Sequence, residues 1–156
     1  MEKFTQEAGS LIIDRLILAI QENKQYLSDI DGAIGDGDHG INMNKGFTLC
    51  REALDKQNGD FTYGLKTLGK TLMDVLIPAD EAYAAAAAEG RSFAEALDAM
   101  DAAALKGRDS TVDMVAKLGR SSRLGERSRG VMDAGSASCY LILHTMADTV
   151  KELLAA

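Results

Sequence analysis

Residues 136–154 read Ser-Ala-Ser-Cys-Tyr-Leu-Ile-Leu-His-Thr-Met-Ala-Asp-Thr-Val-Lys-Glu-Leu-Leu, and this stretch decides the fold class. Its apolar side chains recur at spacings of four and three residues, which is the period of one face of an α-helix. The members of this stripe are Cys139, Leu143, Met146, Val150 and Leu153. The pattern predicts a helix that begins near Ser136 and buries one side against other helices.

The same period runs through most of the remaining chain. Residues 5–27 place Ile13, Leu16, Ile17 and Ile20 on one face of a helix. No stretch alternates with the period of a β-strand. The sequence therefore predicts a single all-α domain over residues 1–156, built as an antiparallel helical bundle. Its other helices are expected over 42–54, 61–76, from Pro78 to Glu89, after the capping box Ser92-Phe-Ala-Glu95, and over 110–118.

Composition restricts the partners and the compartment. The 156 residues carry a formal net charge of −7, which argues against nucleic acid and anionic membrane as partners. A bound cation can reverse the local sign, so a nucleotide phosphate is still compatible. The chain shows neither a signal peptide nor an apolar run long enough to span a bilayer, and Cys50 and Cys139 lack metal-site or redox spacing. We therefore expect a cytoplasmic protein with buried thiols.

An acidic, glycine-rich loop is the main functional signal. Residues 31–44 read Asp-Gly-Ala-Ile-Gly-Asp-Gly-Asp-His-Gly-Ile-Asn-Met-Asn, with carboxylates at Asp31, Asp36 and Asp38. Carboxylates this close repel one another unless a hard cation neutralises them, and glycines let the backbone bend so that they converge. Mg²⁺ held by few protein ligands takes the rest from water and phosphate. The loop predicts nucleotide phosphates held through metal; the alternative is a solvated acidic turn.

Three better-known patterns fit this chain poorly. An EF-hand that starts at Asp36 would need Glu at its twelfth position, where the chain has Phe47. The segment Gly35–Gly40 matches the dinucleotide pattern GxGxxG, but no apolar strand precedes it. The segment Gly64–Thr71 matches the P-loop pattern, also without a strand before it. The apolar residues in and around this segment have helical spacing instead: Phe61, Leu65, Leu68 and Leu72.

A second long loop, from Gly119 to Gly135, is polar and rich in arginine. Both loops end where a helix is expected to begin, near Asn42 and near Ser136, and helix N-termini attract phosphate. An antiparallel bundle can bring the two loops to one end. Arginines of the second loop would then face phosphate oxygens, although each alone also fits a solvated loop. These arginines are Arg120, Arg123, Arg127 and Arg129.

Two motifs resemble those of a known family. Ile-Gly-Asp-Gly-Asp-His-Gly-Ile-Asn-Met-Asn, with Asp31 five residues ahead of Asp36, resembles the nucleotide-binding L subunit of dihydroxyacetone kinases. Gly119-Arg-Ser-Ser-Arg-Leu-Gly-Glu-Arg-Ser128 is similar to that family's Gly-Arg-Ala-Ser-Tyr-Leu-Gly-Glu-Arg-Ser. Residues 70–78 and 133–135 fit as well. The resemblance implies an all-α antiparallel helical barrel with the nucleotide at one end.

The resemblance also implies a site and partners. Two Mg²⁺ ions would be held by Asp31, Asp36 and Asp38 and would bind ADP or ATP. A separate K-type subunit would hold the hydroxyketone, and the phosphoryl donor would be ATP or a phosphotransferase-system protein that recharges bound ADP. An arginine would offset charge on the transferred group. The implied nucleotide contacts are His39, Gly40, Ile41, Asn42, Arg120, Asp133, Ala134 and Gly135.

The chain departs from the family in its middle. Leu-Gly-Lys-Thr-Leu-Met73 runs directly into Asp74-Val-Leu-Ile-Pro78, where the family has a Gly-Gly-Ala-Ser-Gly-Pro-Leu segment and two helices. That segment helps cover the nucleotide. Two explanations fit this junction: the protein is a natural or engineered short form, or the middle segment exists but is missing from the sequence. The lost cover leaves a second hypothesis open: a non-catalytic nucleotide-sensing or adaptor protein with bound ADP. A plain helical interaction domain is a third.

Overall fold

The computed structural model describes residues 5–57, 76–116 and 120–155. These residues form α-helices and short 3₁₀ turns and contain no β-strand, so the all-α prediction is confirmed. No helix within this part of the chain is both long and apolar enough to cross a membrane. The elements are α1 (Gln6–Glu22), α2 (Lys24–Gly32), α3 (His39–Gln57), α5 (Leu76–Ala88), α6 (Phe93–Ser110), η1 (Thr111–Asp113), η2 (Arg120–Ser128) and α7 (Ala134–Ala155).

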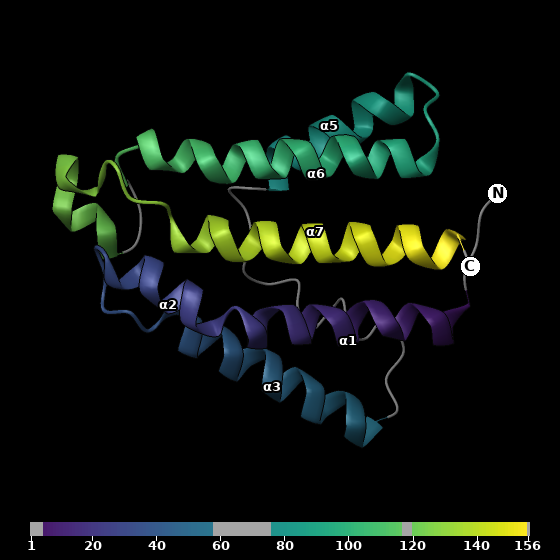
Figure 1. Ribbon diagram of the computed structural model, residues 1–156, viewed down its shortest axis with the longest axis horizontal. Helices are drawn as coiled ribbons and strands as arrows, with labels where there is room; N and C mark the ends of the chain where they lie inside the picture. The colour runs from purple at the N-terminus through teal and green to yellow at the C-terminus, as the bar shows by residue number, and fades with distance from the viewer. Residues whose placement is uncertain (1–4, 58–75, 117–119, 156) are drawn as a thin grey trace.

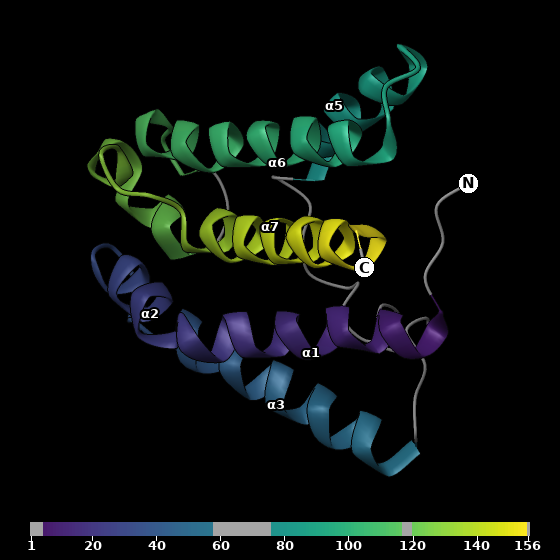
Figure 2. The ribbon, with the colours of Figure 1, turned by 45° about the vertical axis from the view of Figure 1, so that its right-hand side comes forward.

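The helices pack side by side in a row. Figures 1 and 2 show the order α5, α6, α7, α1 and α3, with each helix antiparallel to its neighbour, and the tertiary contacts join the same pairs. Helix α2 continues α1 and packs on α3 and on α7. The antiparallel arrangement is therefore as predicted. The described helices alone form an open row and do not close into a barrel.

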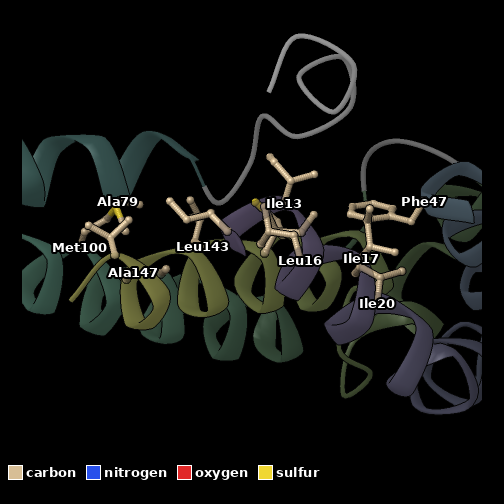
Figure 3. Close-up of a cluster of buried hydrophobic side chains, with 14 of the residues drawn as sticks. Ile13, Leu16, Ile17, Ile20, Phe47, Ala79, Met100, Leu143 and Ala147 are labelled. Carbon is tan, nitrogen blue, oxygen red and sulfur yellow. The ribbon is translucent and has the colours of Figure 1, made fainter. Parts of the chain in front are cut away.

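Helix α1 supplies the centre of the core. Ile12, Ile13, Leu16, Ile17 and Ile20 are each no more than 2% exposed. Burying one such side chain contributes about 1.5–3 kcal/mol, so displacing α1 from the core would be costly. The predicted stripe is confirmed, and Figure 3 shows it within one cluster of buried side chains to which the other helices contribute. The labelled members from those helices are Phe47, Ala79, Met100, Leu143 and Ala147.

The expected helix over 5–27 is in fact two helices. Asn23 ends α1 and precedes α2, and its side-chain Nδ2 donates to the carbonyl oxygen of Ala19 at 2.8 Å. The side chain thus adds a second hydrogen bond to a carbonyl that already accepts the Asn23 backbone N–H at 3.1 Å. The apolar stripe gives no sign of such a bond. Helix α2 then extends to Gly32, so Asp31 lies on its last turn rather than in a loop.

The expected helix over 110–118 is wrong for the described residues. Helix α6 continues to Ser110, and Thr111–Asp113 form only a 3₁₀ turn. The Ser110 hydroxyl donates to the carbonyl of Gly107 at 2.7 Å, and the Thr111 hydroxyl donates to that of Arg108 at 2.6 Å. These hydroxyls bind two of the last four carbonyls of α6, and the Thr111 backbone N–H also bonds to those of Arg108 and Asp109, so the end of the helix is capped locally. At its other end, the predicted capping box of Ser92 and Glu95 is confirmed.

Candidate metal centre

The three predicted aspartates converge. Asp31 comes from the last turn of α2, and Asp36 and Asp38 come from the loop between α2 and α3. One carboxylate oxygen from each lies within 4.8 Å of the others, which is the only such group of acidic, histidine or cysteine side chains in the described residues. Oxygens on opposite sides of one Mg²⁺ are about 4.2 Å apart. The cluster therefore offers all-oxygen ligands at close to the spacing that a hard cation requires.

Glycines make this convergence possible. The Asp31 carbonyl accepts hydrogen bonds from the backbone N–H of Ile34 at 3.2 Å and of Gly35 at 2.5 Å, which turns the chain back over α2. A Cβ atom at position 35 would lie 2.6 Å from the Asp31 Oδ1 atom. Gly37 has a φ of 72°, a left-handed conformation that glycine adopts without strain. The loop thus folds tightly enough to place all three carboxylates together.

Helix α3 begins directly beside the cluster. The Asp38 carbonyl accepts from the Asn42 backbone N–H at 2.8 Å, and the His39 backbone N–H points to the Asp31 Oδ2 atom at 3.4 Å. The first N–H groups of a helix have no partner inside it and attract anions. Gly40 is buried, whereas Ile41 and Asn42 are exposed. His39 is half-buried. The four predicted nucleotide contacts at the start of α3 therefore differ in their exposure.

Helix α7 begins with its own cap. The Asp133 Oδ2 atom accepts from the Ser136 backbone N–H at 2.7 Å, and the Ser136 hydroxyl donates to the Asp133 carbonyl at 2.7 Å. The Thr111 hydroxyl oxygen accepts from the Asp133 N–H at 3.2 Å. Asp133 therefore has a structural role that our prediction did not include. Its position three residues before Ser136, where a helix was expected, is a typical N-cap signal.

The two loops meet at one end of the row, as predicted. The His39 Nε2 atom lies 3.2 Å from the hydroxyl oxygen of Ser138 on α7, and the Tyr26 hydroxyl on α2 donates to the Met132 sulfur at 3.8 Å. Figures 1 and 2 show the α2–α3 loop, η2 and the start of α7 together at the left. His39 thus links the start of α3 to the first turns of α7.

The predicted arginines divide into two groups where the structure describes them. The Arg129 guanidinium binds Glu126 at 3.0 Å and the carbonyl of Asp113, so it holds η2 against the residues after α6. Arg123 and Arg127 are exposed. The Arg120 side chain lies outside the described part of the chain, as do Gly64–Thr71 and the junction of residues 73 and 74.

A polar seam that the sequence analysis did not identify lies between α6 and α7. His144 places Nδ1 3.0 Å from the Asp101 Oδ1 atom and Nε2 3.4 Å from the Asp148 Oδ2 atom. Lys151 binds Asp98 at 2.8 Å and Asp148 at 2.9 Å, and hydrogen bonds to these two carboxylates raise its pKa. Spacings of three and four on both helices were the available signal.

Comparison with known proteins places the chain in a family. The DAK2 domain family model matches residues 61–148. The chain is 32% identical, over 177 aligned residues, to the ADP-binding subunit DhaL of PEP-dependent dihydroxyacetone kinase 1 from Listeria innocua. That match covers 83% of this chain and 89% of the subunit. The chain is 30% identical, over 174 aligned residues, to DhaL of the PTS-dependent dihydroxyacetone kinase from Lactococcus lactis, and this match covers 84% of this chain and 91% of that subunit. It is 27% identical, over 187 aligned residues, to DhaL of the PEP-dependent dihydroxyacetone kinase from Escherichia coli, and this match covers 82% of this chain and 89% of that subunit.

These matches bear on both the acidic loop and the middle of the chain. Residues 39–156 make up only about three quarters of the chain, so a match over 83% must begin ahead of Asp38 and span the acidic loop. The alignment of 177 residues is also longer than the 156-residue chain, so the relative carries residues that have no counterpart here. The chain belongs to the DAK2 domain family and is a DhaL-like member of it.

Proposed function

We propose that this chain is the nucleotide-binding, phosphoryl-transfer subunit of a kinase for dihydroxyacetone or a similar hydroxyketone. One observation carries the proposal: Asp31, Asp36 and Asp38 converge within 4.8 Å at the start of α3, in a chain related to ADP-binding subunits. Helix α3 adds backbone N–H groups that favour an anion at the same place. A site with these two components favours a nucleotide polyphosphate together with a divalent cation.

The residues present fit Mg²⁺. All three side chains offer carboxylate oxygen, which is the ligand type that Mg²⁺ prefers, and two of them are half-buried while Asp36 is exposed. We assign two Mg²⁺ ions to the three carboxylates, with ADP or ATP completing their coordination. When bound, these ions would supply Lewis-acid charge neutralisation at the phosphates. The protein's own part is to hold the carboxylates together and to present the start of α3.

The remaining contacts belong to the second loop. We place the nucleotide between the α3 start, from His39 to Asn42, and residues 133–135 at the start of α7, with Arg120 directed to the phosphates. The hydrogen bond between His39 and Ser138 supports this placement because it fixes the distance between the two helix ends. Since that bond uses the ring of His39, we assign the ring to linking the two helices and the backbone of α3 to the phosphates.

The proposed reaction needs two partners. We propose that a K-type subunit holds the hydroxyketone, because the site assigned to this chain consists of metal and phosphate ligands. The kinases of the Listeria innocua and Escherichia coli relatives are named PEP-dependent, and that of the Lactococcus lactis relative is named PTS-dependent. These names favour a phosphotransferase-system protein that recharges bound ADP over free ATP as the donor.

The length of the alignments favours a second candidate. Relatives carry residues that this chain lacks, and a site with less cover excludes water less well and stabilises transferring charge less. A nucleotide-sensing adaptor that retains ADP is therefore the alternative. An assay with a K-type subunit, dihydroxyacetone and a phosphoryl donor separates the two, because only the kinase subunit supports formation of phosphorylated product.

Calorimetric titration with ADP, with and without Mg²⁺, tests nucleotide binding through metal. The parent protein should bind ADP much more tightly when Mg²⁺ is present. Asp36→Asn should lose at least about tenfold in Mg²⁺-dependent ADP affinity. Mutation of a group that only supports a metal ligand already costs about tenfold in metal affinity, and loss of the ligand itself should cost no less. Asp29→Asn is the matched control, because Asp29 is an exposed carboxylate on α2 that accepts from Gln25 outside the cluster. Equal ADP affinity in the parent and Asp36→Asn would refute the metal assignment.

A further inference from the structure

Helices α2 and α3 approach each other more closely than side chains normally permit. A Cβ atom at Gly40 would lie 1.9 Å from the Lys24 carbonyl oxygen, 2.7 Å from the Ser28 hydroxyl oxygen and 2.8 Å from the Ser28 backbone nitrogen. Two of these three atoms belong to the backbone of α2, which cannot rotate away. Any side chain at position 40 would therefore push the first turn of α3 off α2.

This contact lies next to the carboxylate cluster. Ser28 is one helical turn before Asp31 on α2, and Gly40 is two residues after Asp38 at the start of α3. Because Asp31 and Asp38 are attached to these two helix ends, the separation of α2 and α3 at Gly40 sets the separation of the two carboxylates. The α-carbon of Gly40 thus faces α2, and its lack of a side chain is explained by packing.

A second glycine acts on the cluster directly. A Cβ atom at Gly35 would lie 2.6 Å from the Asp31 Oδ1 atom and 2.8 Å from the Asp31 carbonyl oxygen. The Asp31 carboxylate can rotate away from such an atom, but it is one of the three converging carboxylates. The Asp31 carbonyl oxygen belongs to the backbone, so the turn after α2 would also have to shift. In contrast, a Cβ atom at Gly46, farther along α3, would meet nothing within 4 Å.

We propose that Gly40 and Gly35 are positioning residues of the metal centre. Gly40 acts through the spacing of α2 and α3, and Gly35 acts through the orientation of the Asp31 carboxylate. The inference rests on the proposed function, because bound metal is what responds to the spacing of the carboxylates. Groups that orient metal ligands typically change metal affinity by about 10- to 100-fold when altered.

The test compares three glycine-to-alanine variants of the full chain. Gly35→Ala, Gly40→Ala and the control Gly46→Ala are titrated with Mn²⁺ alone, followed by electron paramagnetic resonance, and their thermal unfolding is recorded. Gly35→Ala should bind Mn²⁺ about 10- to 100-fold more weakly. It should melt slightly earlier than the parent, because its Cβ atom would also press on the Asp31 backbone carbonyl oxygen. Gly40→Ala should lose similar affinity and also melt earlier. Gly46→Ala should keep the parent affinity and melt no earlier, because alanine favours helix over glycine.

The outcomes separate the inference from the proposed function. Parent-like Mn²⁺ affinity in Gly35→Ala would overturn the inference while the parent's own Mn²⁺ binding still supports the metal site. If the parent binds no Mn²⁺, the inference and the metal part of the proposed function both fail. If Gly40→Ala does not fold, Gly35→Ala decides alone, since its expected defect does not depend on helix packing.

Discussion

Helices α3 and α7 both begin directly after an aspartate, at the same end of the molecule, yet the two aspartates differ in what they bind. The Asp133 carboxylate accepts the Ser136 backbone N–H and thus caps the start of α7. The Asp38 carboxylate instead lies with those of Asp31 and Asp36. An aspartate before a helix can therefore serve the fold or a ligand, and the neighbouring side chains decide which.

The difference extends to the charges around each helix start. In the second loop Arg129 is paired with Glu126, so positive and negative charges offset each other within the chain. In the acidic loop three carboxylates share a space within 4.8 Å, and their mutual repulsion is a cost that a cation removes. The first loop thus gathers charge of one sign, and the described part of the second contains at least one ion pair that offsets its charge.

The largest effect should come from Asp38→Asn. Removal of one of three crowded carboxylates should weaken Mg²⁺-dependent ADP binding by at least about tenfold. Loss of a metal ligand should lower metal affinity at least as much as loss of a group that supports a ligand. Stability should hold or rise, because repulsion is relieved. Calorimetry with ADP and Mg²⁺, paired with urea unfolding, measures both. A clear loss of stability with unchanged ADP affinity would mean that Asp38 is a helix N-cap like Asp133. The proposed difference between the two helix starts would then be wrong.

Asp133→Ala should show the opposite pattern. Loss of the α7 cap should lower the free energy of unfolding by about 1 kcal/mol, measured by urea denaturation. Asp133→Asn is the matched control, because asparagine caps about as well as aspartate. The contrast would fail if the two variants were equally stable, since the capping bond would then contribute nothing.

Ser138→Ala tests the bond that joins the two regions. The substitution removes the hydroxyl's bonds to the His39 ring nitrogen and to the Gly135 carbonyl, and it should cost about 1 kcal/mol of stability. A double-mutant cycle of Ser138→Ala with His39→Gln should show a coupling energy. Additive effects in the cycle would mean that the starts of α3 and α7 are not linked through this pair.

The smallest effect should come from the far end of α6. Hydrogen bonds from Ser92 lower the pKa of Glu95 below its usual 4.5, so this contribution to stability is present above the usual value and is lost as the pH falls through the lowered one. Glu95 is exposed, so the loss should be small. In Ser92→Ala the melting temperature should depend less on pH below about pH 5 than it does in the parent. ADP binding should be unchanged. A changed ADP affinity would contradict the separation of the two ends seen in Figure 1.

Local patterns predicted the helices well and their junctions poorly. The stripe of Ile13, Leu16, Ile17 and Ile20 was enough to predict α1, because burial of one face follows directly from helical period. The break at Asn23 was missed because the apolar pattern continues across it. The end of α6 was missed because it depends on the hydroxyl of Thr111, whose bonding the pattern does not show.

The residues that build the site were predictable by type but not by role. Three aspartates among glycines indicated a metal site, and the structure brings them together. The role of Gly40 depends on a contact with Lys24, and that of the His39 ring on Ser138, nearly a hundred residues away. Such roles arise only when distant segments pack, so no local pattern could have assigned them.

Crystals of the full chain grown with ADP and Mn²⁺ would test the metal site most directly, through the anomalous scattering of the metal. We predict anomalous peaks bounded by the carboxylates of Asp31, Asp36 and Asp38, with the ADP phosphates beside them at the start of α3. Bound ADP with no peak at these carboxylates, or metal bound elsewhere on the chain, would contradict the proposed function.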